Sequence, residues 1–352
     1  MSSYSNGVVR IGVLGAGHWG PNLIRNFISN ERSRVVAIAD TNAGRREAVL
    51  ARYPGVDGHD RAESLLARDD LDAVVIATPT ATHHRLAVAA LARGLHVLVE
   101  KPLARTTAEA EELGRIAADA GLVLLTGHVF LFHEAVRTVR RLIDDGELGR
   151  VQYIQSVRTN LGPIRTDVSA LWDLAAHDVS IFHYWLNGLP SRVTGKGGIY
   201  VNKGIEDVVF ATLEYPGGVL ANLHATWLSP NKLRQITVVG EQRMLVFDDM
   251  NLAEPVRIYD KGVAPVTEPG CEESYPIVDS FVGFRSSIRD GEISVPLIPA
   301  GEPLRAECEH FLDCIVDGAR PLSGAAESIA VVRVLEAVER SLRAGSAEQH
   351  VS

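Results

Sequence analysis

The sequence predicts an α/β chain with a doubly wound parallel sheet, followed by an α+β part with an open, mainly antiparallel sheet. Three observations predict this. Apolar runs alternate with amphipathic helices up to about residue 127, which is typical of a parallel sheet covered on both faces. A glycine-rich turn follows the first apolar run, at residues 15–20. Beyond residue 128 several strands follow one another without helices between them, which indicates antiparallel pairing.

In the first part we expect six short strands separated by helices, with each strand bounded by turn residues. The strands are expected at 8–14, 35–40, around 56, 71–77, 96–100 and 122–126, and the helices at 22–29, 45–52, 83–93 and 107–120.

In the second part the pattern predicts helices at 134–144 and 171–186, and a strand at 151–159. Further strands are expected at 206–215, 218–227, 233–239, 244–247 and 256–259, with a turn at Pro216, Gly217 and Gly218. Residues 261–303 show little periodicity and are expected to form an extended excursion. Helices at 303–317 and 325–344 close the chain.

Composition limits the class of protein. A chain of 352 residues favours two domains, and the net charge of -9 disfavours nucleic-acid binding. No secretory signal or membrane-length apolar run is visible, so a cytoplasmic protein is expected. The three cysteines, Cys271, Cys308 and Cys314, form no metal-binding or disulfide pattern, and we expect them to be reduced.

The glycine-rich turn has the spacing GxGxxG between a strand and a helix, at Gly15, Gly17 and Gly20. The first glycine permits a tight turn, the second lets the backbone approach a pyrophosphate, and the third allows close helix–strand packing. The following helix presents free N–H groups to the phosphates. This context predicts a Rossmann dinucleotide-binding site.

Asp40 ends the next expected strand, twenty residues after Gly20. A carboxylate at this place binds the adenosine ribose diol and repels a 2′-phosphate, which favours NAD. Arg45 and Arg46 follow closely and are able to reach a 2′-phosphate, so NADP stays open.

Three polar segments follow strands of the first part: Thr78–Pro79–Thr80, Glu100–Lys101–Pro102 and Thr126–Gly127–His128. In a doubly wound sheet, ligands bind beyond the carboxyl ends of the strands. A lysine there can stabilise a developing alkoxide, so Lys101 is a candidate catalytic residue. The alternative for an isolated lysine is a solvated surface position.

Asp173 and His177 are four residues apart, beside the apolar stripe of the helix expected at 171–186. A carboxylate one turn from a histidine can hold the ring of a general base that takes a hydroxyl proton. The alternative is a buried structural histidine with an aspartate on the helix surface.

These motifs together resemble the Gfo/Idh/MocA family of sugar and cyclitol oxidoreductases. The resemblance runs nearly the full length, through GAGHWG (15–20), Asp40, ATPTATHH (77–84), EKPL (100–103), DLAAHD (173–178) and LRAECEHFLDCI (304–315). It implies a catalytic trio of Lys101, Asp173 and His177, with His177 as the base. The implied cofactor-binding residues are Gly15, Gly17, His18, Trp19, Gly20, Asp40, Thr78, Pro79, Thr80, His83, Glu100 and Lys101.

The segment 158–178 resembles family members that act on nucleotide-linked sugars, and it lacks the Gly-Gly run that many members carry before the helix. The expected substrate contacts are His128, Asn160, Arg165, Asp167, Asp173 and His177. A plain flexible loop is the alternative for residues 160, 165 and 167.

The resemblance implies an NAD-binding domain at 1–127 and a substrate-binding and oligomerisation domain at 128–352, with the closing helices packing back on the first. We expect an enzyme, an NAD-dependent dehydrogenase of a secondary hydroxyl, at C3, on a sugar, nucleotide sugar or cyclitol, in amino-sugar or aminocyclitol biosynthesis. It is expected to be a homodimer or homotetramer without a metal. The alternatives are an NADPH-dependent keto-sugar reductase, an NAD-dependent glycosidase and a non-catalytic cofactor-sensing regulator.

Overall fold

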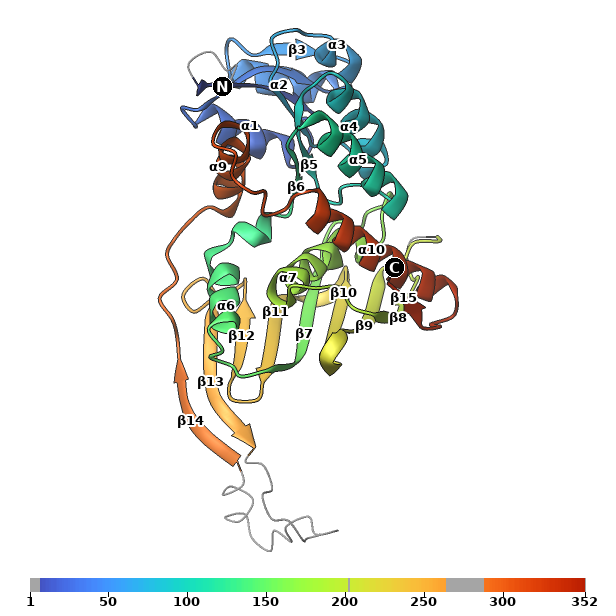
Figure 1. The fold of residues 1–352 in the computed structure, drawn as a ribbon. Helices are drawn as coiled ribbons and strands as arrows, with labels where there is room; N and C mark the ends of the chain where they lie inside the picture. The colour runs from blue at the N-terminus through green and yellow to red at the C-terminus, as the bar shows by residue number, and fades with distance from the viewer. Residues whose placement is uncertain (1–6, 202, 264–287, 352) are drawn as a thin grey trace, which may run out of the picture.

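The computed structural model describes residues 7–201, 203–263 and 288–351. Its first part is a six-stranded, fully parallel sheet in the order β3-β2-β1-β4-β5-β6 (Figure 1). The strand order reverses between β1 and β4, and crevices at such reversals bind ligands in open α/β sheets. The strands are β1 (Val9–Leu14), β2 (Ser33–Ala39), β3 (Asp57–His59), β4 (Ala73–Ile76), β5 (His96–Glu100) and β6 (Leu124–Gly127).

Helices cover both faces of this sheet, because alternate apolar residues of each strand point to opposite sides. One face packs against α1 (Gly20–Ile28), α2 (Ala43–Arg52) and α9 (Pro303–Val316). The other face packs against α3 (Ala62–Leu66), α4 (His83–Ala92) and α5 (Thr107–Ala120). Helix α9 comes from the end of the chain, and the ring of Phe311 packs edge-on against Phe27 of α1.

The second part is a nine-stranded sheet in the order β14-β13-β12-β11-β7-β10-β9-β8-β15. Its pairs are antiparallel except for β7 and β10, which run parallel. The strands are β7 (Val151–Leu161), β8 (Arg192–Gly198), β9 (Val208–Glu214), β10 (Leu220–Thr226), β11 (Leu228–Gly240), β12 (Met244–Asp248), β13 (Val256–Val263), β14 (Ile288–Ser294) and β15 (Gln349–His350).

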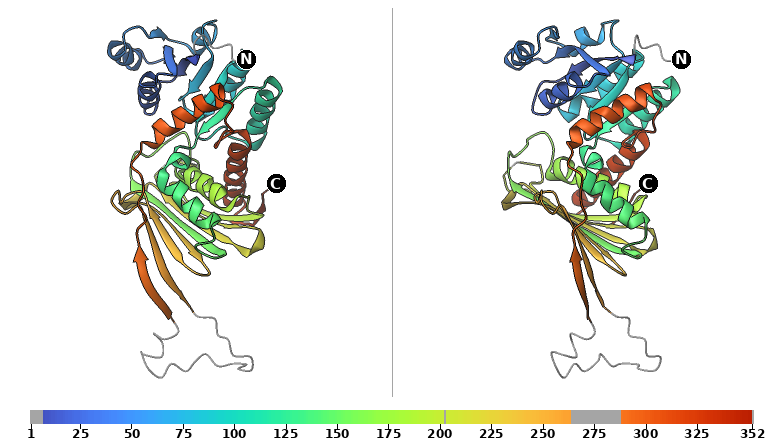
Figure 2. Two further views of the ribbon diagram at one scale, coloured as in Figure 1. Left: turned by 60° about the vertical axis from the view of Figure 1, so that its left-hand side comes forward. Right: turned by 90° about the vertical axis from the view of Figure 1, so that its left-hand side faces the viewer.

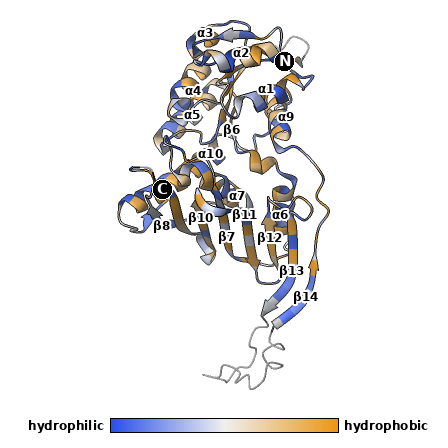
Figure 3. Ribbon diagram, turned by 180° about the vertical axis from the view of Figure 1, so that it is seen from behind, coloured by the Kyte–Doolittle hydropathy of each residue, from blue (hydrophilic) through white to orange (hydrophobic). Residues whose placement is uncertain are grey.

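Three helices lie on one face of this sheet, and no helix of the described residues covers the other face (Figure 2). They are α6 (Glu134–Asp144), α7 (Ala176–Leu186) and α10 (Ala325–Arg343). Helix α10 contacts α5 as well as α7 and β8, so it bridges the two sheets. Seen from behind, the strands show alternating hydrophobic and hydrophilic residues, as expected for a sheet with one solvated face (Figure 3).

Four elements differ from the sequence prediction. Strand β8 was not expected, since three glycines in seven residues lower its intrinsic strand propensity. It forms because it pairs with β9 and because glycine lets α10 approach: a Cβ on Gly195 would lie 3.1 Å from Val338 Cγ1. The prediction also lacked α3, β14 and β15, which are a single-turn helix, a largely polar strand and a two-residue strand. Part of the excursion expected at 261–303, together with Cys271, lies outside the described residues.

The helix expected at 171–186 begins with a π-helical turn, Leu171–Ala175, before α7. A π turn arises from backbone packing that side-chain periodicity does not encode, and such turns occur frequently at functional sites.

In the described part of the chain, no helix has the length and apolar character needed to cross a lipid bilayer.

Candidate active site

One large cavity, about 1340 Å³ in volume, lies between the carboxyl end of the parallel sheet and the helix-covered second sheet. Pockets for a single small ligand typically measure about 300–1000 Å³. This cavity therefore has room for a dinucleotide and a second molecule together. Its walls reach from the glycine-rich loop to the end of β7 and the middle of β11, through Gly15, Asp40, Lys101, His177 and Arg234.

The glycine-rich loop matches a pyrophosphate cradle. Gly15 has a positive φ of 97°, and a Cβ there would lie 2.5 Å from the carbonyl oxygen of Ala77. A Cβ on Gly20 would lie 2.1 Å from the carbonyl oxygen of Gly15. Helix α1 starts without a side-chain cap, so the N–H of Gly20 is available to an anion, whereas Pro21 has no N–H and Asn22 donates to the Trp19 carbonyl. The loop fits the phosphates of a dinucleotide.

Asp40 stands beside this loop at the end of β2. Its Oδ2 accepts a hydrogen bond from the backbone N–H of Ala16 at 2.7 Å, and its Oδ1 accepts one from Asn42 at 2.8 Å. Arg46 donates to the backbone carbonyl of Asp40, whereas Arg45 lines the cavity near Gly17. The carboxylate is thus held in place to meet a ribose diol, with one arginine close by.

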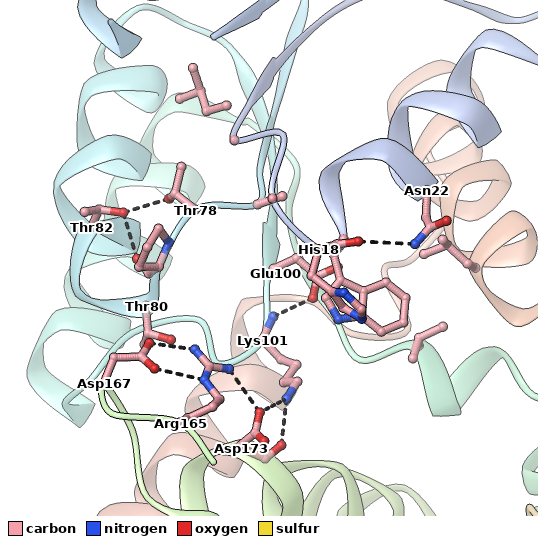
Figure 4. Close-up of a pocket in the computed structure, with 18 of the residues that line it drawn as sticks. His18, Asn22, Thr78, Thr80, Thr82, Glu100, Lys101, Arg165, Asp167 and Asp173 are labelled. Atoms are coloured by element: carbon pink, nitrogen blue, oxygen red, sulfur yellow. Dashed lines mark hydrogen bonds and ion pairs between the residues drawn. The ribbon is translucent and has the colours of Figure 1, made fainter. Parts of the chain in front are cut away.

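Lys101 extends from the end of β5 across the cavity to the π-helical turn (Figure 4). Its Nζ donates to the backbone carbonyl of Asp173 at 2.6 Å and to Asp173 Oδ1 at 3.3 Å. Its side chain is only 10% exposed. The wide π turn presents a backbone carbonyl that a regular helix would keep within its own ladder. The ammonium group is therefore fixed at a single place between the two sheets.

Asp173 lies at the centre of a charge network. Besides Lys101, it accepts hydrogen bonds from Arg165 Nη1 at 3.0 Å and from the indole Nε1 of Trp227 at 3.2 Å. Burial acts to raise the pKa of Asp173, but the charges of Lys101 and Arg165 outweigh it, so the pKa is lowered. Asp173 is therefore an anion at neutral pH that holds the ammonium of Lys101.

His177 lines the same cavity, with its ring edge-on to Phe130 at 5.0 Å between centroids. Its Nδ1 is buried and has no hydrogen-bond partner among the described residues. Burial, followed by the charges of Lys101 and Arg158, holds the pKa of His177 well below its ordinary value. The imidazole is neutral at pH 7 and able to accept a proton. The expectation that Asp173 holds this ring is wrong, because its carboxylate is committed to Lys101, Arg165 and Trp227.

Two carboxyl groups lie close to one another at the base of the cavity. Glu100 lines the cavity and accepts a hydrogen bond from the backbone N–H of Lys101 at 3.3 Å, and Glu307 of α9 is fully buried. Burial raises the pKa of each, and the charge of Glu100 adds to the effect on Glu307. The pair therefore retains a proton more readily than free carboxyl groups do.

Comparison with known proteins shows which family the chain belongs to. Residues 9–128 match the model of an oxidoreductase family with an NAD-binding Rossmann fold, and residues 136–246 match the GFO/IDH/MocA C-terminal domain. The chain belongs to the Gfo/Idh/MocA family. The resemblance inferred from EKPL and DLAAHD is thereby confirmed, as are the fold class and the Rossmann fold that binds NAD.

Three curated relatives illustrate the range of this family. A UDP-N-acetylglucosamine 3-dehydrogenase of Acidithiobacillus ferrooxidans is 28% identical over 87% of this chain and 88% of its own length. Its solved structure, at 25% identity, matches with a TM-score of 0.79 over 95% of this chain and 98% of that one. A scyllo-inositol 2-dehydrogenase of Bacillus subtilis is 26% identical over 89% of this chain and 88% of its own. A 2,7-anhydro-N-acetylneuraminate hydratase of Mediterraneibacter gnavus is 27% identical, with 58% of this chain spanning 57% of it.

In this Gfo/Idh/MocA chain the structure brings most of the predicted site residues to one cavity. Lining it are Gly15, Gly17, His18, Trp19, Asp40, Thr78, Pro79, Thr80, Glu100, Lys101, Asn160, Arg165, Asp167, Asp173 and His177. Arg165 is already engaged, since it forms a two-pronged ion pair with Asp167 at 2.9 and 2.6 Å.

Three predicted residues stand apart from the cavity wall. Gly20 packs against the backbone of Gly15 instead. His83 is buried and spans two loops, with its ring nitrogens 2.8 Å from the carbonyl oxygens of Pro102 and Thr78. His128 is buried and lines a second, smaller cavity on the other side of α7. Gly20 packs closely within the glycine-rich loop and His83 links two loops. Neither His83 nor His128 lines the large cavity, so their direct contacts with cofactor and substrate stay predictions.

Sequence reasoning missed Trp227, Phe130 and Arg158, which also line the cavity. Trp227 follows β10 directly and was predicted as the last residue of that strand, where a tryptophan is usually a core residue. Arg158 is 3% exposed within β7, and its burial is visible only once Asp178 is seen to pair with it. The only indication in the sequence was a charged residue, Arg158, within a strand that is otherwise half apolar.

No group of three or more His, Cys, Asp or Glu within the described ranges is arranged to hold a metal ion.

His128 predicts an acid sensitivity of the fold. Burial lowers its pKa to about 3, against about 6.5 in an unfolded chain. Since the unfolded state then binds more protons below pH 6.5, the free energy of unfolding should fall by about 2 kcal/mol between pH 7 and pH 5 from this residue alone. Urea titrations of the wild type and His128→Gln at both pH values measure it. Equal pH dependence in the two proteins would contradict the prediction.

Proposed function

We propose that this chain is an NAD-dependent dehydrogenase that oxidises a secondary hydroxyl group of a sugar, nucleotide sugar or cyclitol. The observation that carries the proposal is the convergence of Lys101 and His177 on one cavity, which continues to the glycine-rich loop and Asp40. An ammonium and a neutral imidazole beside a dinucleotide cradle are the groups that alcohol oxidation requires.

The roles of the side chains follow from their states. NAD, when bound, supplies the hydride acceptor at its nicotinamide C4. His177 takes the hydroxyl proton while the carbinol C–H bond breaks and the carbonyl forms. Lys101 stabilises the negative charge that develops on the reacting oxygen. Asp173, held by Trp227 and Arg165, keeps that ammonium in place. Asn160 and Asp167 lie further along the wall and are proposed substrate contacts.

The substrate class rests on both the relatives and the wall of the cavity. The relatives named above act on a nucleotide sugar, an inositol and a sialic-acid derivative. The cavity has room for a nucleotide sugar beside a dinucleotide, and its wall carries polar side chains such as Asn160. The arginines of this wall are already paired with carboxylates: Arg158 with Asp178, and Arg234 with Asp249. We propose oxidation at C3 of a nucleotide-linked hexose, in amino-sugar or aminocyclitol biosynthesis.

A screen for NADH formation tests the proposal. The purified chain is incubated with NAD and UDP-hexoses, dTDP-hexoses, hexose phosphates or inositols, with Lys101→Met as the matched inactive control. We expect NADH with at least one nucleotide sugar and none with the control. If no member of the panel yields NADH or a chemically altered product, the dehydrogenase proposal is wrong.

A redox-neutral reaction is the second candidate, favoured by the relative named as a hydratase. In such a reaction the hydride returns to the product after elimination or addition, as in NAD-dependent glycosidases. Product analysis by mass spectrometry separates the two cases: substrate would be consumed with NAD present, yet no NADH would accumulate.

Asp40 is expected to set the choice between NAD and NADP. Replacing it by asparagine removes the charge that repels a 2′-phosphate while leaving an oxygen able to accept from the Ala16 N–H. With Arg45 close to the loop, the ratio of NADP to NAD affinity should rise at least about tenfold. Cofactor titrations measure it, with Asp119→Asn, an exposed residue that does not line the cavity, as the control. An unchanged ratio would remove Asp40 from cofactor selection.

The open face of the second sheet is the proposed surface for self-association. Tyr153, Phe210 and Leu220 are about half exposed on its strands, and Tyr153 lies opposite Leu220 in register. We expect light scattering to yield a dimer or tetramer of the 38.1 kDa chain. The double variant Tyr153→Glu and Leu220→Glu should reduce the mass. A monomeric wild type would contradict the proposal.

A further inference from the structure

A deeply buried ion pair borders the cavity, whose lining includes Arg158. Arg158 of β7 donates to both carboxylate oxygens of Asp178 in α7, at distances of 2.9 to 3.1 Å. The two side chains are only 3% and 2% exposed. Removing two charges from water is costly, and buried ion pairs are often no more stabilising than apolar residues of the same size. Stability alone is therefore a weak reason for this pair.

The position of the pair connects it to His177 by two routes. Asp178 is the next residue in the helix, so Arg158 anchors the turn that carries His177. The second route is through Phe130: the guanidinium carbon of Arg158 lies 4.6 Å from the centre of its ring. The imidazole of His177 meets the same ring edge-on at 5.0 Å. The aromatic ring therefore contacts both the cation and the imidazole.

We propose that Arg158, Asp178 and Phe130 form a positioning unit that sets the orientation of the His177 ring and the electrostatic potential at it. Arg158 contributes a fixed positive charge, Asp178 partly offsets that charge, and Phe130 packs against both the guanidinium and the imidazole. The unit deepens the proposed function, since its importance for turnover rests on His177 acting as the base. Its effect on the imidazole itself does not depend on that role.

Other charges also face His177 and have to be kept constant in any test. Lys101 from the end of β5, Arg234 of β11 and His128 before the 3-10 turn that carries Phe130 all oppose protonation of the imidazole. Asp173 lies one turn earlier on the same helical segment. On the far side of α7, Arg140 of α6, His183 of α7 itself and Glu327 of α10 line the second cavity, which measures about 440 Å³.

The proposal makes a prediction that a purely structural pair does not. Arg158→Gln removes the cation and leaves the anion, so the imidazole should protonate at higher pH. Asp178→Asn removes the anion and leaves the cation, so it should protonate at lower pH. At these separations we expect each midpoint to move by at least about half a pH unit, in opposite directions. The double variant should return close to the wild type.

The midpoint is measured directly by NMR of full-length protein labelled at histidine Cε1, with His177→Asn to assign the signal. Arg158→Lys keeps the charge and serves as a second variant if Arg158→Gln does not fold, with a midpoint expected near that of the wild type. Opposite shifts for the two single changes support the proposal. Coincident midpoints, or shifts in the same direction, would overturn it.

The acid limb of kcat/KM then separates this inference from the proposed function. If the NMR midpoints move in opposite directions and the acid limb follows them, both hold. If the midpoints move and the acid limb does not, the positioning unit holds and the role of His177 as base fails.

Discussion

Replacement of Lys101 by methionine is expected to lower kcat at least about 100-fold while NAD still binds. The ammonium is held at 2.6 Å from the carbonyl oxygen of Asp173, on the cavity wall that it shares with His177. A charge fixed in a partly water-excluded cavity stabilises a developing oxyanion more strongly than a mobile surface lysine would. Steady-state kinetics and an NAD titration measure the two effects separately.

The controls for this change address folding and charge. Lys196→Met removes an exposed lysine from β8 and should leave kcat near that of the wild type. The thermal midpoint of Lys101→Met shows whether Asp173 tolerates the loss of one partner, since it retains Arg165 and Trp227. Turnover close to the wild type with the true substrate would remove Lys101 from the mechanism.

Replacement of His177 by asparagine is expected to lower kcat by about 100- to 10,000-fold, the usual contribution of a general base. The fold should be little affected, because the ring's Nδ1 has no hydrogen-bond partner among the described residues and the ring packs against Phe130. Turnover measured at several pH values checks the result, with the exposed His350→Asn as the matched control.

The lowered pKa of His177 determines the pH at which the activity should decrease. The neutral imidazole is the form that accepts a proton, so activity in the oxidation direction should persist through pH 7 and fall only well below pH 6.5. Lys101 is one cause of the lowered pKa, so the residual activity of Lys101→Met should fall at a higher pH than that of the wild type. An acid limb that stays in His177→Asn would assign it to another group.

Much of the fold could be predicted because its signals are local. The alternation of apolar runs and helices, the turn at Gly15 and the carboxylate at Asp40 follow from backbone sterics and strand periodicity. The bounds of α5 and α6 were predicted to the residue. In α5 the local signals are clear, because Thr106 caps its first turn and Gly121 ends it in a left-handed conformation. Elements that form only through pairing, such as β8 and β15, have no comparable local signal.

The candidate site also has a part that could be predicted from the sequence and a part that could not. The residues Lys101, Asp173 and His177 were identifiable because strand ends and the i,i+4 spacing on a helix are properties of the chain itself. Their partners were not: Asp173 was expected to hold His177, and it is bound instead by Lys101, Arg165 and Trp227. A carboxylate pairs with the cations and donors that the packing brings nearest, and three separate elements supply them.

By itself the sequence determined the order of the elements, the dinucleotide cradle and the residue types available for chemistry, because each depends on neighbours within a few positions. The tertiary structure alone decided which charges are buried and with what partner. It brought Arg158 of β7 against Asp178 of α7 and placed Phe130 in contact with both Arg158 and His177. Burial and electrostatic coupling depend on distances between segments far apart in the chain, and only folding sets those distances.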